Sequence, residues 1–344
     1  MMSIRTPWSS HYTVTTNRLE KEGSNMSSSG VKVSAVTPPV YLGEGPHWCV
    51  REQALYYVDI PNQDVHRYHP QTEKHSKMHI DGGFVTLVVP HKDLSDVLIV
   101  SVGRSLMSAT WPQPKNNISV NAKNLVTIAS VDDKYPDNRF NDGKCDVLGR
   151  LWAGTMNSKT DVGQNLLDGS HYCLRNDGSI NKILDQVAIS NGLEWSADNK
   201  TFYFIDSDAY RVDAYTCDFA THALSDRRTI IDYKLVGLKP AFPDGMTIDE
   251  DGKLWVASYG AGKIHCINPV TGKIERWVDI PCSNVTSVCW GGPQFDHMYV
   301  TCTSKGLSEE QLAKQPQAGS VFRITGLGCH GRPSNECKVA IPKK

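Results

Sequence analysis

Two similar stretches decide the fold of this chain: Asp146-Val-Leu-Gly-Arg-Leu-Trp152-Ala-Gly and Asp249-Glu-Asp-Gly-Lys-Leu-Trp255-Val-Ala. Each is a polar turn with a glycine, followed by a short strand-like run whose second residue is aromatic. Looser copies recur along the chain, one of them without the aromatic residue. The equivalent positions, 42 to 54 residues apart, are Tyr56, Leu98, Trp152, Tyr203, Trp255 and Tyr299.

Six repeats of this length, made of short strands and turns, are typical of a β-propeller. Because one such unit cannot bury its own faces, we expect the units to pack around a common axis. The predicted fold is all-β: a six-bladed β-propeller, each blade a four-stranded antiparallel sheet around a central channel. The length of 344 residues alone favours two domains, but one propeller over residues 35–330 accounts for the repeat.

The segments around the repeat are assigned from composition. Residues 1–34 are rich in serine and threonine without an amphipathic period, so we predict a flexible leader. A transit peptide is the alternative for this segment, although its two glutamates count against it. Residues 331–344 are predicted to be a C-terminal tail, and the one helix-like run is Ser308 to Lys314.

The overall composition excludes several classes of protein. With 36 Lys+Arg against 37 Asp+Glu, the chain lacks the basic excess of a nucleic-acid binder. Neither a membrane-spanning apolar run nor the apolar core of a signal peptide occurs, so we expect a cytoplasmic monomer with no membrane partner. The ten cysteines form no CxxC pair and are predicted to be reduced and buried.

The repeat also locates a candidate site. Eleven or twelve residues before four of the repeat positions stand side chains with oxygen atoms: Glu44, Asn141, Asn191 and Asp244. The innermost strands of a propeller face the channel, so we expect these positions to converge there. Two carboxylates and two amides suit Ca²⁺, Mg²⁺ or Mn²⁺ better than a soft metal, since zinc normally recruits His or Cys. Unrelated hairpin turns are the alternative, because Asn-Gly and Asp-Gly are common turn dipeptides.

The stretches around these residues resemble the SMP-30/gluconolactonase/LRE family. The resemblance covers about residues 38–330 and implies a six-bladed propeller with one divalent cation in the channel and lactonase activity, typically on sugar lactones. The motifs that carry it are Gly43-Glu44-Gly45-Pro46-His47-Trp48, Asn138-Arg139-Phe140-Asn141-Asp142-Gly143-Lys144, Ser190-Asn191-Gly192-Leu193-Glu194-Trp195, Pro243-Asp244-Gly245-Met246 and Phe322-Arg-Ile-Thr-Gly-Leu-Gly328.

The resemblance also implies roles for single residues. By it, Glu44, Asn191 and Asp244 would hold the cation, Arg139 and Asn141 would contact the substrate, and Asp244 would also be the acid/base. Ca²⁺ is the expected ion, with Zn²⁺, Mn²⁺ or Mg²⁺ as alternatives. One position departs from the family: where an acidic residue helps some members bind the sugar, this chain has a lysine at position 159, which puts the sugar specificity in doubt.

The chemistry of these groups agrees with a small lactone as substrate. Hydrolysis develops negative charge on the carbonyl oxygen, which a cation with an open position stabilises while it lowers the pKa of bound water. The planar fork of Arg139 could hold substrate oxygens, or Arg139 could be a surface residue. Two other classes fit the same sequence: a calcium-binding regulatory protein without turnover, and a propeller that serves as an interaction scaffold.

Several neighbouring residues are predicted to be structural. Asp59 and Asp206 end matched strands and are expected to fix the connections between strands. His47 is expected to pack or support the site rather than bind the metal. The tryptophans at matched positions are expected to pack between blades: Trp48, Trp152, Trp195, Trp255 and Trp290.

Overall fold

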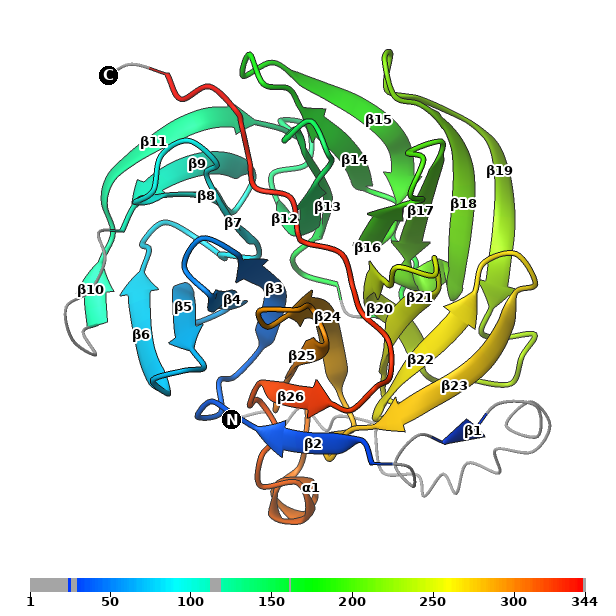
Figure 1. The fold of residues 1–344 in the computed structure, drawn as a ribbon. Helices are drawn as coiled ribbons and strands as arrows, with labels where there is room; N and C mark the ends of the chain where they lie inside the picture. The colour runs from blue at the N-terminus through cyan, green and yellow to red at the C-terminus, as the bar shows by residue number, and fades with distance from the viewer. Residues whose placement is uncertain (1–23, 26–29, 112–118, 161, 343–344) are drawn as a thin grey trace, which may run out of the picture.

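A computed structural model of the chain confirms the predicted six-bladed β-propeller, whose sheets form a ring around a central channel (Figure 1). The structure describes residues 24–25, 30–111, 119–160 and 162–342. Every blade has four antiparallel strands. Two blades carry a further short parallel strand at their outer edge: β1 (Ser24–Asn25) pairs with β23, and β10 (Ser119–Asn121) pairs with β6.

Five blades are built from strands that follow one another along the chain from the channel outward. The first two blades contain β3 (Gly43–Cys49), β4 (Ala54–Asp59), β5 (Asp64–His69) and β6 (Lys74–His79), then β7 (Val88–Pro90), β8 (Val97–Val102), β9 (Ser105–Thr110) and β11 (Lys123–Ser130). The third contains β12 (Asn138–Cys145), β13 (Leu151–Asn157), β14 (Gly169–Leu174) and β15 (Ile180–Val187). The fourth and fifth contain β16 (Ser190–Trp195), β17 (Thr201–Asp206), β18 (Arg211–Asp218) and β19 (Ala223–Asp232), then β20 (Phe242–Ile248), β21 (Leu254–Tyr259), β22 (Lys263–Asn268) and β23 (Lys273–Asp279).

The sixth blade joins the two ends of the propeller. Its inner strands are β24 (Val285–Gly291), β25 (His297–Cys302) and β26 (Phe322–Thr325), and its outermost strand is β2 (Lys32–Ala35), which pairs antiparallel with β26. Strand β2 begins before the predicted propeller boundary at residue 35, so part of the predicted leader belongs to the sheet. Within that leader, residues 1–23 and 26–29 lie outside the described residues.

The repeated aspartate and tryptophan build the turn between the first two strands of a blade. Asp146 accepts a hydrogen bond from Trp152 Nε1, and Asp249 accepts one from Trp255 Nε1, both at 2.9 Å. Each aspartate also accepts from the backbone N–H four residues later, so one carboxylate closes the turn and orients the indole. All six predicted repeat positions lie in second strands.

The predicted packing tryptophans lie between blades. Trp48, Trp152, Trp195, Trp255 and Trp290 are all buried. Trp152 meets Trp195 of the next blade edge to face at 5.6 Å, and Trp255 meets Trp290 in the same way at 5.7 Å. Each of these contacts joins two neighbouring sheets in a shared apolar cluster.

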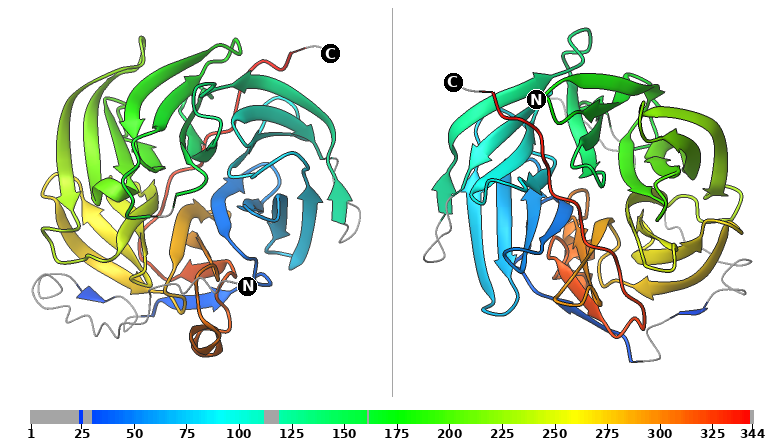
Figure 2. Two further views of the ribbon diagram at one scale, coloured as in Figure 1. Left: turned by 180° about the vertical axis from the view of Figure 1, so that it is seen from behind. Right: turned by 45° about the horizontal axis from the view of Figure 1, so that its top comes forward.

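The chain after β26 crosses one mouth of the channel as an extended segment, residues 330–340, which we call the C-terminal strap (red in Figure 1). Its backbone hydrogen-bonds to residues of four blades, with Glu250, Phe295, Pro90 and Gly149 among the partners. From behind, the strap lies on the far face of the ring (Figure 2). The predicted tail is therefore attached to the propeller over most of its length, because its backbone groups find partners on the blades.

Short helices and free cysteines complete the description of the fold. The helix-like run forms α1 (Glu309–Lys314), capped by Ser308, and a short 3₁₀ helix, η2, spans Ser207–Ala209. In the described part of the chain, no helix has the length and apolar character needed to cross a bilayer. All ten cysteines are free thiols, and all but Cys329 are buried.

Candidate functional site

Four inner strands bring the predicted site residues into one cavity. Glu44 lies on β3, Arg139 and Asn141 on β12, Asn191 on β16 and Asp244 on β20, and all five line a cavity of about 650 Å³. Asn191 and Asp244 are almost completely buried. The positions that the repeat predicted to converge therefore meet at one mouth of the channel.

A β-bulge occurs at or next to each of these positions. The register of the first strand pair shifts after Glu44 in β3, around Asn141 in β12, around Asn191 in β16 and around Asp244 in β20. Bulges redirect side chains and are frequent beside active sites. The sixth blade repeats the feature around Thr286 in β24, which also lines the cavity.

The glycine after Asp244 has a packing role. A Cβ atom at Gly245 would lie 2.0 Å from Ser287 Oγ on the neighbouring inner strand β24. Glycine therefore allows adjacent inner strands to approach closely where they bulge.

A chain of hydrogen bonds fixes the polar side chains. Arg139 Nη1 donates to Asn141 Oδ1 at 2.7 Å, and Asn141 Nδ2 donates to Asn191 Oδ1 at 3.0 Å. Asn191 Nδ2 donates to Ser207 Oγ at 2.8 Å, and that hydroxyl donates to the carbonyl of Pro243 at 2.7 Å. Since an amide oxygen has two lone pairs, Asn191 Oδ1 keeps acceptor capacity for a further partner.

The two carboxylates of the cavity lie in an environment that opposes their charge. Burial and then the nearby Asp142 raise the pKa of Glu44 to about 8, against the hydrogen bond from Gly45 and the charge of Arg139. Burial, then Glu44 and Asp142, raise the pKa of Asp244 well above its usual value. Buried carboxylates that repel one another are stabilised by a cation between them.

The donor set fits a hard divalent cation. Asp244 Oδ1 is buried and has no hydrogen-bond partner among the described residues. No group of three or more His, Cys, Asp or Glu residues in the described ranges is placed to hold a metal. An ion bound by Glu44 and Asp244 would therefore take an amide oxygen, such as that of Asn191, as its third protein ligand, which hard cations accept.

Two residues of the site were missed by the sequence interpretation. Asp142, which follows Asn141 directly, is a third carboxylate close enough to raise the pKa of Glu44. Phe84 lines the cavity, and the centre of its ring lies 5.7 Å from the guanidinium carbon of Arg139. Phe84 belongs to a loop outside the repeated pattern, so the spacing carried no signal for it.

Lys159 does not line the cavity. Its ammonium group pairs with Asp137 at 2.8 Å, and its side chain is 72 % exposed. The neighbours Ser158 and Thr160 line the cavity instead. The lysine at this position therefore adds no positive charge to the cavity.

The two aspartates predicted to fix the connections between strands do so. Asp59 accepts hydrogen bonds from the backbone of Tyr41 and Leu42, and Asp206 accepts from the two residues before β16, Ala188 and Ile189. Each aspartate thereby holds the loop that enters an inner strand. Burial lowers the pKa of His47 to about 3, which keeps this channel residue uncharged.

Comparisons with known proteins match this chain to one protein family and to solved structures with the same fold. A profile described as the SMP-30/Gluconolactonase/LRE-like region matches residues 42–304. The chain is 41% identical to regucalcin of Oryctolagus cuniculus over 307 residues, which cover 89% of this chain and 98% of the relative. Among solved structures, a luciferin-regenerating enzyme is similar with a TM-score of 0.83 and 35% identity, covering 90% of this chain and 100% of the other. A calcium-binding protein, regucalcin, of Agrobacterium tumefaciens shares the fold with a TM-score of 0.76 and 23% identity, covering 88% and 96%.

Proposed function

The chain belongs to the SMP-30/gluconolactonase/LRE-like family, and we propose that it is a divalent-metal-dependent hydrolase of a small, sugar-type lactone. The observation that carries this proposal is the pair of carboxylates, the half-buried Glu44 and the buried Asp244, which line one cavity with the Asn191 amide and the Arg139 guanidinium. A cavity of about 650 Å³ has the size of a small-molecule site.

Glu44, Asn191 and Asp244 would hold the cation. Their oxygen atoms suit Ca²⁺ best, with Mg²⁺, Mn²⁺ and Zn²⁺ as alternatives. When bound, the ion supplies stabilisation for negative charge on the lactone carbonyl oxygen and lowers the pKa of a coordinated water. The raised pKa values of Glu44 and Asp244 support this assignment, since a cation would relieve the repulsion that raises them.

The protein's own groups orient the lactone and transfer the proton. Arg139 and Asn141 bind substrate oxygens through N–H groups whose positions the hydrogen-bond chain already restrains. As water attacks the carbonyl carbon, Asp244 accepts its proton. The ester C–O bond of the ring then breaks, and Asp244 returns the proton to the leaving oxygen. The net reaction consumes one lactone and one water molecule and forms one hydroxy acid.

The direct test is a panel of small lactones assayed with protein that has been depleted of metal and then given Ca²⁺, Zn²⁺, Mn²⁺ or Mg²⁺. Turnover should disappear on depletion and return with at least one ion. Metal binding without turnover of any lactone would instead favour a calcium-binding regulatory protein, for which the same carboxylates suffice. Tolerance of substitution at both Glu44 and Asp244 would favour the interaction scaffold.

A second experiment separates the two proposed roles of Asp244. Asp244→Asn should lower kcat by about 10²–10⁴-fold, the usual contribution of a general base, and weaken metal binding. Excess metal should restore occupancy but not the rate. The matched control is Asn191→Ala, a ligand without a role in proton transfer, in which excess metal should restore turnover. Recovery in both variants would make Asp244 only a ligand.

A further inference from the structure

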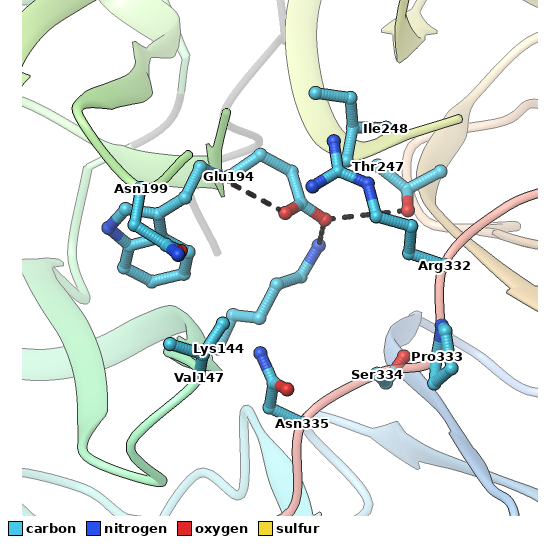
Figure 3. Close-up of a pocket in the computed structure, with 11 residues that line it drawn as sticks. Lys144, Val147, Glu194, Asn199, Thr247, Ile248, Arg332, Pro333, Ser334 and Asn335 are labelled. Atoms are coloured by element: carbon cyan, nitrogen blue, oxygen red, sulfur yellow. Dashed lines mark hydrogen bonds and ion pairs between the residues drawn. The ribbon is translucent and has the colours of Figure 1, made fainter. Parts of the chain in front are cut away.

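A second cavity, of about 250 Å³, lies under the C-terminal strap (Figure 3). Its walls combine the strap residues Arg332 and Asn335 with the inner-strand residues Lys144, Glu194 and Thr247. We call the cavity that contains Glu44 and Asp244 the lactone cavity. Each of the three inner-strand residues follows a residue of that cavity on the same strand by three positions, which is about 10 Å in an extended chain. Among the described residues, none lines both cavities. The strap cavity is therefore a separate site at the other end of the channel.

One positive charge in this cavity is not balanced. Lys144 Nζ pairs with Glu194 Oε1 at 2.5 Å and donates to the carbonyl of Met246 at 2.9 Å, so the carboxylate in the wall is neutralised. Glu194 also accepts from the hydroxyl of Thr247. Arg332 has buried Nε and Nη2 atoms without a hydrogen-bond partner in the part of the chain that the structure describes. Burying such donors unsatisfied is costly, so this guanidinium is set up for an acceptor.

The strap holds Arg332 in this position. The preceding residue, Gly331, donates its N–H to the carbonyl of Phe295 at 2.8 Å and packs directly on Trp290. Arg332 lines this cavity together with Lys144 and Glu194, and the three side chains overlap in the view of Figure 3. Polar side chains of Asn199, Ser334 and Asn335 complete the walls.

We propose that the strap cavity binds a small oxyanion, the phosphate or carboxylate group of a compact molecule, with Arg332 as its main anchor. The planar fork of arginine matches two oxygens of such a group, and Lys144 adds a second cationic side chain to the lining of the same cavity. The volume corresponds to roughly eight water molecules at ~30 Å³ each, which admits one compact anion. A bound anion would link the strap to the inner strands of three blades.

The test is calorimetric titration of the full, metal-depleted protein with inorganic phosphate and, separately, with succinate. We expect saturable binding of one equivalent of at least one anion, weakened by salt. Which anion binds identifies the group recognised. Arg332→Gln should weaken binding at least about tenfold, because it removes charge-assisted hydrogen bonds. Glu44→Gln should leave anion binding unchanged, so this result does not depend on the proposed lactonase.

The matched control is Lys338→Gln, which removes one exposed positive charge from the same strap outside the cavity. It should change the affinity less than about twofold, since an exposed charge contributes little. If Arg332→Gln does not fold, as judged by circular dichroism, Ser334→Phe fills the cavity without a change in charge and should abolish binding. Three outcomes would overturn the proposal. The wild type could fail to bind either anion, Arg332→Gln and Lys338→Gln could lose affinity equally, or a folded variant with the filled cavity could bind as well as the wild type.

Discussion

At the scale of single residues, Glu44 is held where its own charge is disfavoured. Without metal, the folded chain keeps a proton on Glu44 up to a pKa of about 8, whereas the unfolded chain releases it near the ordinary value of 4.5. Between these values the folded state binds more protons than the unfolded state, so Glu44 makes the metal-free protein less stable as the pH rises. A bound cation reverses this effect, because it favours the ionised carboxylate.

Glu44→Gln should therefore separate stability from metal binding. In metal-free protein its melting temperature, relative to wild type, should rise as the pH increases from about 5 to 8, since the glutamine cannot ionise. Its calorimetric metal affinity should fall by an order of magnitude or more. Glu250→Gln, at an exposed residue outside the lactone cavity, is the matched control and should alter neither property. A variant that is less stable than wild type at pH 8 without metal would contradict the assignment.

At the scale of elements, the strap crosses the mouth of the channel opposite the lactone cavity. Its fit depends on a close contact, since a Cβ atom at Gly331 would lie 1.8 Å from Trp290 Cγ. The strap is also bonded by its backbone, as at Cys337, which donates to the carbonyl of Pro90 at 2.9 Å. A change at Gly331 should therefore act on the strap and spare the lactone cavity.

Gly331→Ala should lower the melting temperature by several degrees, because overpacking typically costs about 1–3 kcal/mol. It should also weaken oxyanion binding through the displacement of Arg332. Turnover at the opposite mouth should stay close to wild type below the melting temperature. Lys338→Ala, exposed on the same strap, serves as the control and should leave the melting temperature unchanged. An equal effect of both substitutions would show that the contact with Trp290 is unimportant.

At the scale of the whole molecule, the ring is closed by strands from the two ends of the propeller. Strand β2 pairs with β26 at four positions, from Lys32 with Thr325 to Ala35 with Phe322. Without β2, the outer edge of β26 would expose unpaired backbone groups. The parallel pair of β1 with β23 is only two residues long and adds little to closure.

Two truncations test this closure. Removal of residues 1–30 should leave the melting temperature and turnover essentially unchanged, because β2 is kept. Removal of residues 1–35 deletes β2 and should lower the melting temperature by several degrees or cause aggregation through the exposed edge. Thermal unfolding and light scattering of both truncations provide the measurement. A large loss in the shorter truncation would mean that closure extends beyond β2.

The sequence by itself determined the number of blades and the positions that meet in the channel. The turn from Asp146 to Trp152 and its copy from Asp249 to Trp255 are local, since each aspartate bonds an indole six residues away. Because such local contacts recur with each sequence repeat, equivalent positions such as Glu44 and Asp244 can be aligned by their spacing. Aligned positions are expected to lie at the same depth along the channel. The family resemblance then supplied roles for them that spacing could not.

Only the tertiary structure decided the features that depend on distant segments. Strand β2 was counted mainly as leader because its partner β26 lies nearly 300 residues later. Phe84 reaches Arg139 from a loop outside the repeat. Arg332 lines the same cavity as Lys144 only because the strap crosses the channel. Each contact is formed by packing between segments whose own sequences carry no sign of the partner. Local patterns thus specify the blades, whereas the closure of the ring, the walls of the lactone cavity and the strap cavity arise when the blades assemble.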